Sequence, residues 1–150
     1  MKMFKIILAS NSKVRKKILD ENNVDSEVFP SNLDEDSVKE GMLKENIGPE
    51  QISKNLAELK ANKVSLKFNS DIVIGADSVI DINGELISKP TNRAEALQIL
   101  NKLNGKKHYL ISSVCISRNG SMIWNYTDKA KLTMKNFNEK ELKNYLSKIS

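Results

Sequence analysis

A single carboxylate inside an apolar stretch is the first candidate for chemistry. Asp77 follows the apolar residues 72–74 and the small pair 75–76, and it stands near the centre of residues 71–90. A short apolar run bounded by turn signals predicts a buried central strand, and small residues in it leave room for a ligand. A carboxylate there is seldom buried without a partner, and Lys89 is the nearest cation with a reason to lie beside it. A solvated Asp at a strand end, with a surface Lys, would show the same pattern.

Two serines and an arginine form a second candidate, an anion site. An apolar strand expected at residues 3–9 leads into a helix whose first turn follows Ser12. Free backbone N–H groups and the positive end of the helix dipole favour anions at such a position. Ser10 and Ser12 add hydroxyls, and Arg15 adds a planar guanidinium suited to phosphate. An ordinary N-cap with a cationic outer face would carry the same residues.

An acidic segment at residues 31–40 is the third candidate. It contains three clustered carboxylates, those of Asp34, Glu35 and Asp36. Such a cluster can hold a hard divalent cation through its oxygens. A solvated acidic loop or the start of a helix has the same composition, so both alternatives stay open.

Lys60 differs from the other lysines in its place on a helix. The helix is predicted from residue 49 to about residue 67, with Ile52, Leu56 and Leu59 on its buried face. At about 100° per residue, Lys60 falls inside this apolar arc. A lysine there either extends its ammonium group to solvent or meets a buried anion.

The remaining patterns predict the elements that must position these residues. Strands are expected at residues 3–9, 24–30, 72–80, 108–117, 122–126 and 129–135, and helices at 13–21, 49–67, 92–103 and 138–149. Asn83–Gly84 and Asn119–Gly120 predict tight turns. Ala130, Leu132 and Met134 are expected to face inward. No repeat or linker divides the chain, so we expect one α/β domain over residues 1–150.

Composition limits the classes of function. The chain has 150 residues, 39% of them hydrophobic, and no apolar stretch approaches the ~20 residues needed to span a membrane. One cysteine, Cys115, excludes an internal disulfide and fits a reducing cytoplasm, and with a single histidine it cannot form a His/Cys zinc site. Any metal would be held by carboxylates and phosphate oxygens.

The net charge of +5 favours an acidic partner: a nucleotide, a nucleic acid or an anionic surface. The lysines are scattered and only 5% of the residues are aromatic, so no stacking platform for single-stranded nucleic acid is visible. A solvated basic surface explains most of this charge.

Five segments together resemble the motifs of the Maf-type nucleotide pyrophosphatases. Residues 7–19 (ILASNSKVRKKIL) resemble the family's Ala-Ser-x-Ser-Pro-Arg-Arg motif, and residues 73–79 (VIGADSV) resemble its Gly-Ala-Asp-Thr-Val strand. Residues 88–108, which begin Ser-Lys-Pro, are similar to its Lys-Pro segment. Weaker matches are residues 55–61 (NLAELKA) and 33–36 (LDED), and the order and spacing agree along nearly the whole chain.

This resemblance implies a fold and an activity. The fold would be a mixed sheet flanked by helices, with two lobes around a cleft, as in inosine triphosphatase. The activity would be hydrolysis of nucleoside triphosphates to monophosphate and pyrophosphate, which removes noncanonical or modified nucleotides. The resemblance also implies a divalent cation (Mg²⁺ or Mn²⁺), a cytoplasmic location and a homodimer.

The resemblance also assigns roles to residues. Asp77 falls on the position of the proposed proton acceptor, where it would orient or deprotonate the attacking water or hold the metal. Glu35 could share either task, and Lys89 falls on a polar active-site position. Four residues are expected to bind the substrate: Ser10, Ser12, Arg15 and Lys60.

The sequence also departs from the family's pattern. Lys13 and Val14 replace a Pro and an Arg, and Ser78 stands where subfamilies have Thr or Gln, which leaves the base preference open. The family continues for about a further third of this length, so we expect a domain truncated at its C-terminus relative to the family.

Three hypotheses follow, in order. The first is a nucleoside triphosphate pyrophosphatase. The second is a nucleotide-binding fragment without catalytic activity. The third, well behind and motivated only by the net charge, is a nucleic-acid-binding protein, whose binding would depend steeply on salt.

Overall fold

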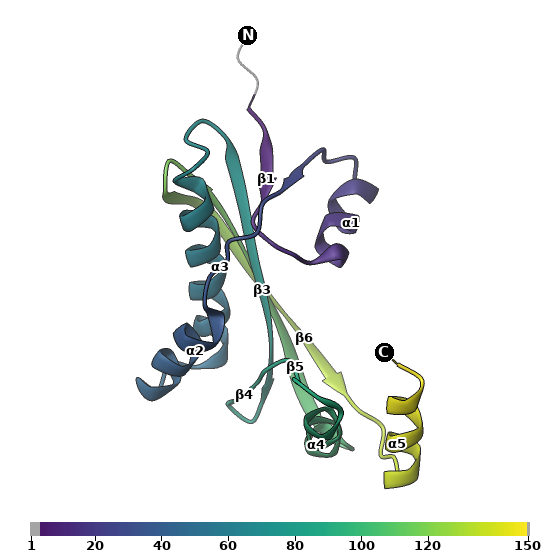
Figure 1. Ribbon diagram of the computed structural model, residues 1–150. Helices are drawn as coiled ribbons and strands as arrows, with labels where there is room; N and C mark the ends of the chain where they lie inside the picture. The colour runs from purple at the N-terminus through teal and green to yellow at the C-terminus, as the bar shows by residue number, and fades with distance from the viewer. Residues whose placement is uncertain (1–3, 150) are drawn as a thin grey trace.

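A long central strand, β3 (Ile72–Ile82), organises the fold. The computed structural model describes residues 4–149, and its sheet has the order β2-β1-β3-β5-β6, with β4 also paired to β3 (Figure 1). The other strands are β1 (Ile6–Leu8), β2 (Glu27–Val28), β4 (Glu85–Ile87), β5 (Lys107–Arg118) and β6 (Ser121–Thr133). The pairs β1–β2 and β1–β3 are parallel and the others antiparallel, so the mixed sheet predicted from the sequence is confirmed. Met3, where the first strand was expected to begin, lies outside the described residues.

Five helices surround this sheet in the described part of the chain. They are α1 (Lys13–Glu21), α2 (Glu35–Lys44), α3 (Pro49–Ser65), α4 (Arg93–Leu103) and α5 (Glu139–Ser147). Figure 1 shows α1, β1 and β2 at one end of β3, and β4, α4 and α5 at the other. The helix α3 lies along β3 and β5, with α2 beside it. A cleft between the two groups of elements stays a prediction.

Local sequence signals explain most of the element boundaries. Both predicted Asn-Gly turns have positive φ at each residue, 52° and 85° at Asn83–Gly84 and 53° and 78° at Asn119–Gly120. This is the backbone conformation that a two-residue hairpin of type I′ requires. Asn138 caps α5 in a reciprocal capping box with Glu141, as the spacing of the two residues predicts.

The main core lies between α3 and the sheet. Ile52 and Leu56 of α3 are fully buried, and the sheet contributes Ile7, Val73 and Cys115. Burial of these side chains holds α3 at a fixed place above β3, since removal of apolar area from water is the main favourable term in folding. Cys115 is among these core residues and is 1% exposed.

Some residues predicted to face inward are exposed. Leu59 is 41% exposed because it lies on the edge of α3 that turns away from the sheet. Ala130 and Leu132 are also exposed, since β6 is the outer strand of the described sheet and α3 covers chiefly β3 and β5. Only Met134 packs as expected, against the small cluster of Ile82, Ile87 and Leu103.

Two predicted segments at residues 122–126 and 129–135 form one continuous strand, β6, which is 13 residues long. Val14 and Ile18 of α1 are exposed, so these apolar side chains are not packed against the rest of the fold. Within the described residues, no helix combines the length and the apolar character needed to cross a membrane.

The contrast between Leu56 and Leu59 provides a test of this packing. We expect Leu56→Ala to lower the free energy of unfolding by about 2 to 5 kcal/mol, because the fully buried side chain would leave a cavity. The matched variant Leu59→Ala, three residues along the same helix, should cost less than about 1 kcal/mol. Urea denaturation of both variants measures the difference, and similar losses would contradict this placement of α3.

Candidate active site

A gap in the strand pairing of β3 marks the site. On one edge of β3, β1 pairs with residues 72–74 and β4 pairs with residues 80–82. The residues between them, 75–79, are paired only on the other edge, with β5. Asp77 lies at the middle of this gap. One backbone edge of β3 is therefore unpaired at the position of the isolated carboxylate.

The ammonium group of Lys60 links three elements at this gap. Its Nζ lies 2.8 Å from Glu35 Oε1, 3.0 Å from the Ala76 carbonyl oxygen and 3.2 Å from Asp77 Oδ1. A lysine ammonium has three N–H donors, and each has one acceptor here. Lys60 is only 5% exposed, so of the two alternatives left by the sequence, the structure shows the meeting with a buried anion.

Asp77 is as deeply buried as its partner but has fewer hydrogen bonds. It is 5% exposed, and its Oδ2 has no hydrogen-bond partner among the described residues. Burial raises the pKa of the Asp77 carboxyl above its usual value, although the nearby Lys60 ammonium acts in the opposite direction. The result is a carboxylate with one anchored oxygen, one free oxygen and a raised affinity for protons.

Glu35 reaches this pair from the start of α2. The acidic segment is a helix start rather than a loop, since the Asp34 side chain accepts a hydrogen bond from Ser37 N as the N-cap of α2. Glu35, the first residue of that helix, is 40% exposed at its side chain. Lys63 fixes the preceding segment, because its Nζ donates to the Asn32 carbonyl oxygen at 3.1 Å.

The predicted anion site forms at the end of β1. Ser12 caps α1 and accepts a hydrogen bond from Arg15 N at 3.2 Å. Ser10 Oγ accepts two more, from Ser12 N and from Arg15 Nη1, each at 3.1 Å. The parallel register that pairs Leu8 with Ile74 brings this loop to the same edge of β3 as Asp77. The structure thus brings together the three residues of the predicted anion site.

Lys89 does not pair with Asp77, so the partner predicted for that carboxylate was wrong. Lys89 is exposed and lies two residues beyond β4, whose last residue, Ile87, pairs with Ile80. The lysine that pairs with Asp77 comes from α3 instead. The signal for it was the place of Lys60 inside the apolar arc of its helix. A catalytic role of Lys89 stays a prediction.

Comparison with known proteins agrees with this geometry. The family described as Maf-like protein matches residues 5–150. The chain belongs to the Maf-like family. It is 70% identical over 145 residues to the nucleoside triphosphate pyrophosphatase of Pelagibacter ubique, covering 97% of this chain and 74% of that relative. The corresponding protein of Caulobacter vibrioides is 38% identical over 148 residues, covering 99% of this chain and 74% of its own length.

Solved structures support the fold alone. The Maf-like chain is similar to a HAM1 protein from Coxiella burnetii, with a TM-score of 0.54 and 16% identity over 86% of this chain and 71% of that one. For the Ham1 protein of Staphylococcus aureus the TM-score is 0.52, with 17% identity over 86% and 70% of the two chains. The mixed sheet with flanking helices is therefore shared with the Ham1 fold.

Two carboxylates of the Maf-like site, those of Asp77 and Glu35, are the candidates for holding a divalent cation. The described residues contain no group of three or more His, Cys, Asp or Glu side chains placed to hold a metal ion. Asp77 Oδ2 is free, however, and Asp77 and Glu35 carry one more negative charge than Lys60 neutralises. Mg²⁺ is often held by one or two carboxylates together with substrate phosphates and water, and this donor set suits that arrangement.

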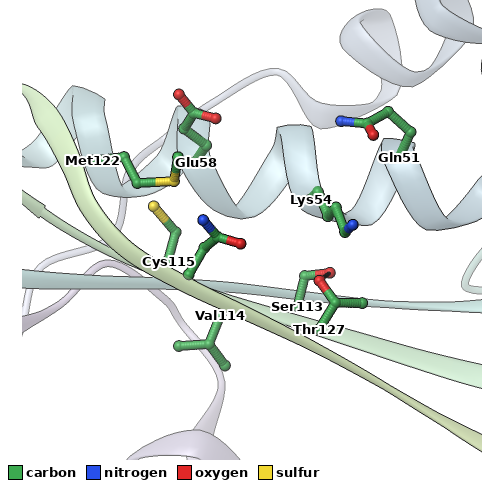
Figure 2. A pocket seen from close by; sticks show the side chains of 9 residues that line it. Gln51, Lys54, Glu58, Ser113, Val114, Cys115, Met122 and Thr127 are labelled. Carbon is green, nitrogen blue, oxygen red and sulfur yellow. Dashed lines mark hydrogen bonds between the residues drawn. The ribbon is translucent and has the colours of Figure 1, made fainter.

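A cavity of about 190 Å³ lies on another flank of α3, between this helix and the strands β5 and β6. Figure 2 shows Ser113 and Thr127 side by side at one end of it, with Cys115 and Met122 towards the other. None of the predicted site residues lines it. Ser113 of β5 is nevertheless the residue paired with Asp77 of β3. Its Oγ lies 2.7 Å from Ser53 Oγ and 2.9 Å from Thr127 Oγ1. No pattern in the sequence indicates that these hydroxyls are neighbours.

The Lys60–Asp77 pair provides a test of site electrostatics. We expect Lys60→Met to lower the free energy of unfolding by about 3 to 5 kcal/mol near neutral pH, because a buried carboxylate would lose its ion-pair partner. The variant's Asp77 should have a higher pKa still, so the loss should shrink as the pH falls and Asp77 becomes protonated.

Denaturation with urea at about pH 8 and about pH 5 measures this dependence. The control is Lys63→Met, since Lys63 is exposed and bonds only a loop carbonyl. Equal losses for the two variants at both pH values would contradict the buried ion pair.

Proposed function

We propose that this chain hydrolyses nucleoside triphosphates to nucleoside monophosphate and pyrophosphate. The observation that carries the proposal is the Glu35–Lys60–Asp77 cluster at the pairing gap of β3, in which Lys60 and Asp77 are buried and one Asp77 oxygen has no hydrogen-bond partner. The family membership and the activity named for the Pelagibacter ubique relative support the same reaction.

Asp77 would act on the attacking water. Its free Oδ2 orients the water and accepts a proton, and the raised pKa makes this carboxylate a better base than an ordinary Asp. The water oxygen forms a bond to the α-phosphorus, and the bond from the α-phosphorus to the bridging oxygen of the β-phosphate breaks. Pyrophosphate leaves with the electron pair of that bond.

Cationic groups and N–H donors would bind the triphosphate. Donors for phosphate oxygens at the end of β1 would come from Arg15, Ser10, Ser12 and the N-terminus of α1. Lys60 holds Asp77 in place from one side and counters negative charge that shifts during the reaction. A divalent cation held by Asp77 and Glu35 would neutralise further phosphate charge. Lys89 is proposed as an additional catalytic residue.

We also propose a location, an oligomeric state, a cofactor and a substrate class for this enzyme. The 150 residues act as one domain of a cytoplasmic homodimer, with Mg²⁺ or Mn²⁺ as cofactor. Noncanonical or modified nucleotides are the proposed substrates. The single buried cysteine is compatible with a reducing compartment.

A nucleotide panel combined with one variant tests the reaction. We expect pyrophosphate release by the wild type with Mg²⁺ or Mn²⁺ and a loss of at least about 100-fold in Asp77→Asn, since an amide cannot accept the proton. Asp128→Asn, a change at an exposed Asp on β6, should retain full activity. Turnover by Asp77→Asn at the wild-type rate would refute the assignment of Asp77.

The stability of Asp77→Asn separates loss of chemistry from loss of fold. Burial raises the pKa of Asp77, which means that its ionised form is costly in the folded state at pH values above that pKa. Asn removes this cost, and its amide oxygen can still accept from Lys60 while Glu35 supplies an opposite charge, so we expect the variant to stay folded with a melting temperature near that of the wild type at neutral pH. If no nucleotide is turned over by either protein but nucleotides still bind, the alternative of an inactive nucleotide-binding fragment is supported.

A change at Arg15 tests phosphate binding. We expect Arg15→Ala to raise KM for the triphosphate by about 10-fold or more, because a charge-assisted hydrogen bond is worth about 1.5 to 3 kcal/mol. Lys17→Ala removes a cation from the exposed face of the same helix, so its KM should change little. Steady-state kinetics of both variants provide the comparison, and equal effects would show that only the net charge matters.

A further inference from the structure

We propose that Gly75 is a positioning residue, whose missing side chain lets α3 approach β3 closely enough to place Lys60 Nζ on Asp77. The catalytic consequence of this placement rests on the proposed function. The placement itself is a property of the folded chain, and it can be measured without turnover.

The space at Gly75 is already occupied by α3. A Cβ at this position would lie 2.4 Å from the Ala57 carbonyl oxygen, 2.8 Å from Ala61 N and 2.9 Å from Ala61 Cβ. Apart from atoms of its own residue and its chain neighbours, a real Cβ atom essentially never has another heavy atom within 3.0 Å. Two of the three atoms belong to the helix backbone, which cannot rotate aside as a side chain can, so a side chain at residue 75 would displace the helix.

Backbone conformation does not require a glycine here. Gly84, Gly105 and Gly120 have φ of 85°, 69° and 78°, in the left-handed region that favours glycine. Gly75 lies instead within the regular strand β3, where any residue can adopt the backbone angles. The close approach of α3 is therefore the physical reason for a glycine at this position.

The contact lies next to the residues of the site on both elements. Ala57 and Ala61 flank Lys60 on α3, and Gly75 precedes Asp77 by two residues, so both face α3 from the same side of β3. Lys60 donates to Ala76 and Asp77 on β3 and to Glu35 on α2. If α3 moved away from β3, the bonds to β3 would lengthen, and the three contacts would no longer be satisfied together.

The expected result of Gly75→Ala is a loss that falls mainly on kcat. A displacement of reacting groups by about 1 Å can cost on the order of 100-fold, so we expect kcat to fall by about 10- to 100-fold. Because the hydrogen bonds of the anion site join Ser10, Ser12 and Arg15 to one another, KM should change less than about 3-fold. Pyrophosphate release by the folded variant measures both constants.

Two control variants separate position from stability. Gly41→Ala adds a methyl group where no atom lies within 4 Å, so kcat should be unchanged. Ala61→Gly introduces a poor helix former into α3 and lowers thermal stability, but it keeps the close approach. We expect it to retain wild-type kcat at temperatures where it is folded. An equal loss of kcat in Ala61→Gly would overturn the proposal, since loosening of the helix would then suffice.

The Lys60 ammonium group gives a readout that does not depend on turnover. Its three acceptors slow the exchange of its protons with water, so its ¹H–¹⁵N signal should be observable in the wild type and in Gly41→Ala. We expect the signal to be lost or strongly broadened in Gly75→Ala. If the wild type shows no turnover, this measurement still tests the placement, and the proposed function fails separately.

An unchanged Lys60 signal together with wild-type kcat in a folded Gly75→Ala would overturn the proposal. If Gly75→Ala does not fold, Ala61→Ser serves as the second variant, because it enlarges the same contact by one atom from the helix side. We expect a smaller loss of kcat and a broadened Lys60 signal in that variant. Wild-type values for both in Ala61→Ser would equally refute the role of this contact.

Discussion

The burial of one ammonium group is the constraint on which this structure depends. Removing a charge from water costs several kcal/mol unless hydrogen bonds and opposite charges replace its hydration. Lys60 finds those replacements only where α3 lies against β3 and where α2 begins, since its acceptors come from Glu35, Ala76 and Asp77. A change in the spacing of any two of these elements leaves a buried donor without an acceptor. The ion-pair cluster therefore fixes the geometry of the fold and of the candidate active site at once.

Strand pairing explains why the edge of β3 beside this buried cluster has no neighbouring strand. A fully paired β3 would place Asp77 between two neighbouring strands, but β1 ends at the level of Ile74 and β4 ends at the level of Ile80. The short length of β1 also brings the loop of Ser10 and Arg15 to this edge of β3. The early ends of two strands thus leave the predicted anion site and Asp77 at the same edge of β3.

Features that depend on neighbouring residues could be predicted from the sequence more fully than contacts between distant residues. Turns, caps and strand limits depend on neighbouring residues, so Asn119–Gly120 and Asn138 could be interpreted directly. The place of Lys60 in an apolar arc also predicted a choice between solvent and a buried anion. The partner of Asp77 could not be chosen, because sequence distance favoured Lys89 while the packing of α3 brought Lys60 into contact. Leu59 and Leu132 were wrongly placed for a related reason: a helical or alternating pattern shows which residues share a face but not how much of that face is covered.

The unpartnered oxygen of Asp77 connects stability with activity. Folded proteins rarely leave a buried polar atom without a hydrogen bond, because such an atom lowers the free energy of unfolding. A serine or an amide near Oδ2 would remove that cost, and it would also lower the pKa of the carboxyl and occupy the position of the attacking water. Packing at Gly75 also serves the position of Lys60, because the close approach of α3 leaves no room for a side chain that would displace this helix. The proposed site is therefore packed tightly against α3 and keeps one carboxylate oxygen without a hydrogen bond, which suits the proposed role of Asp77 as a general base.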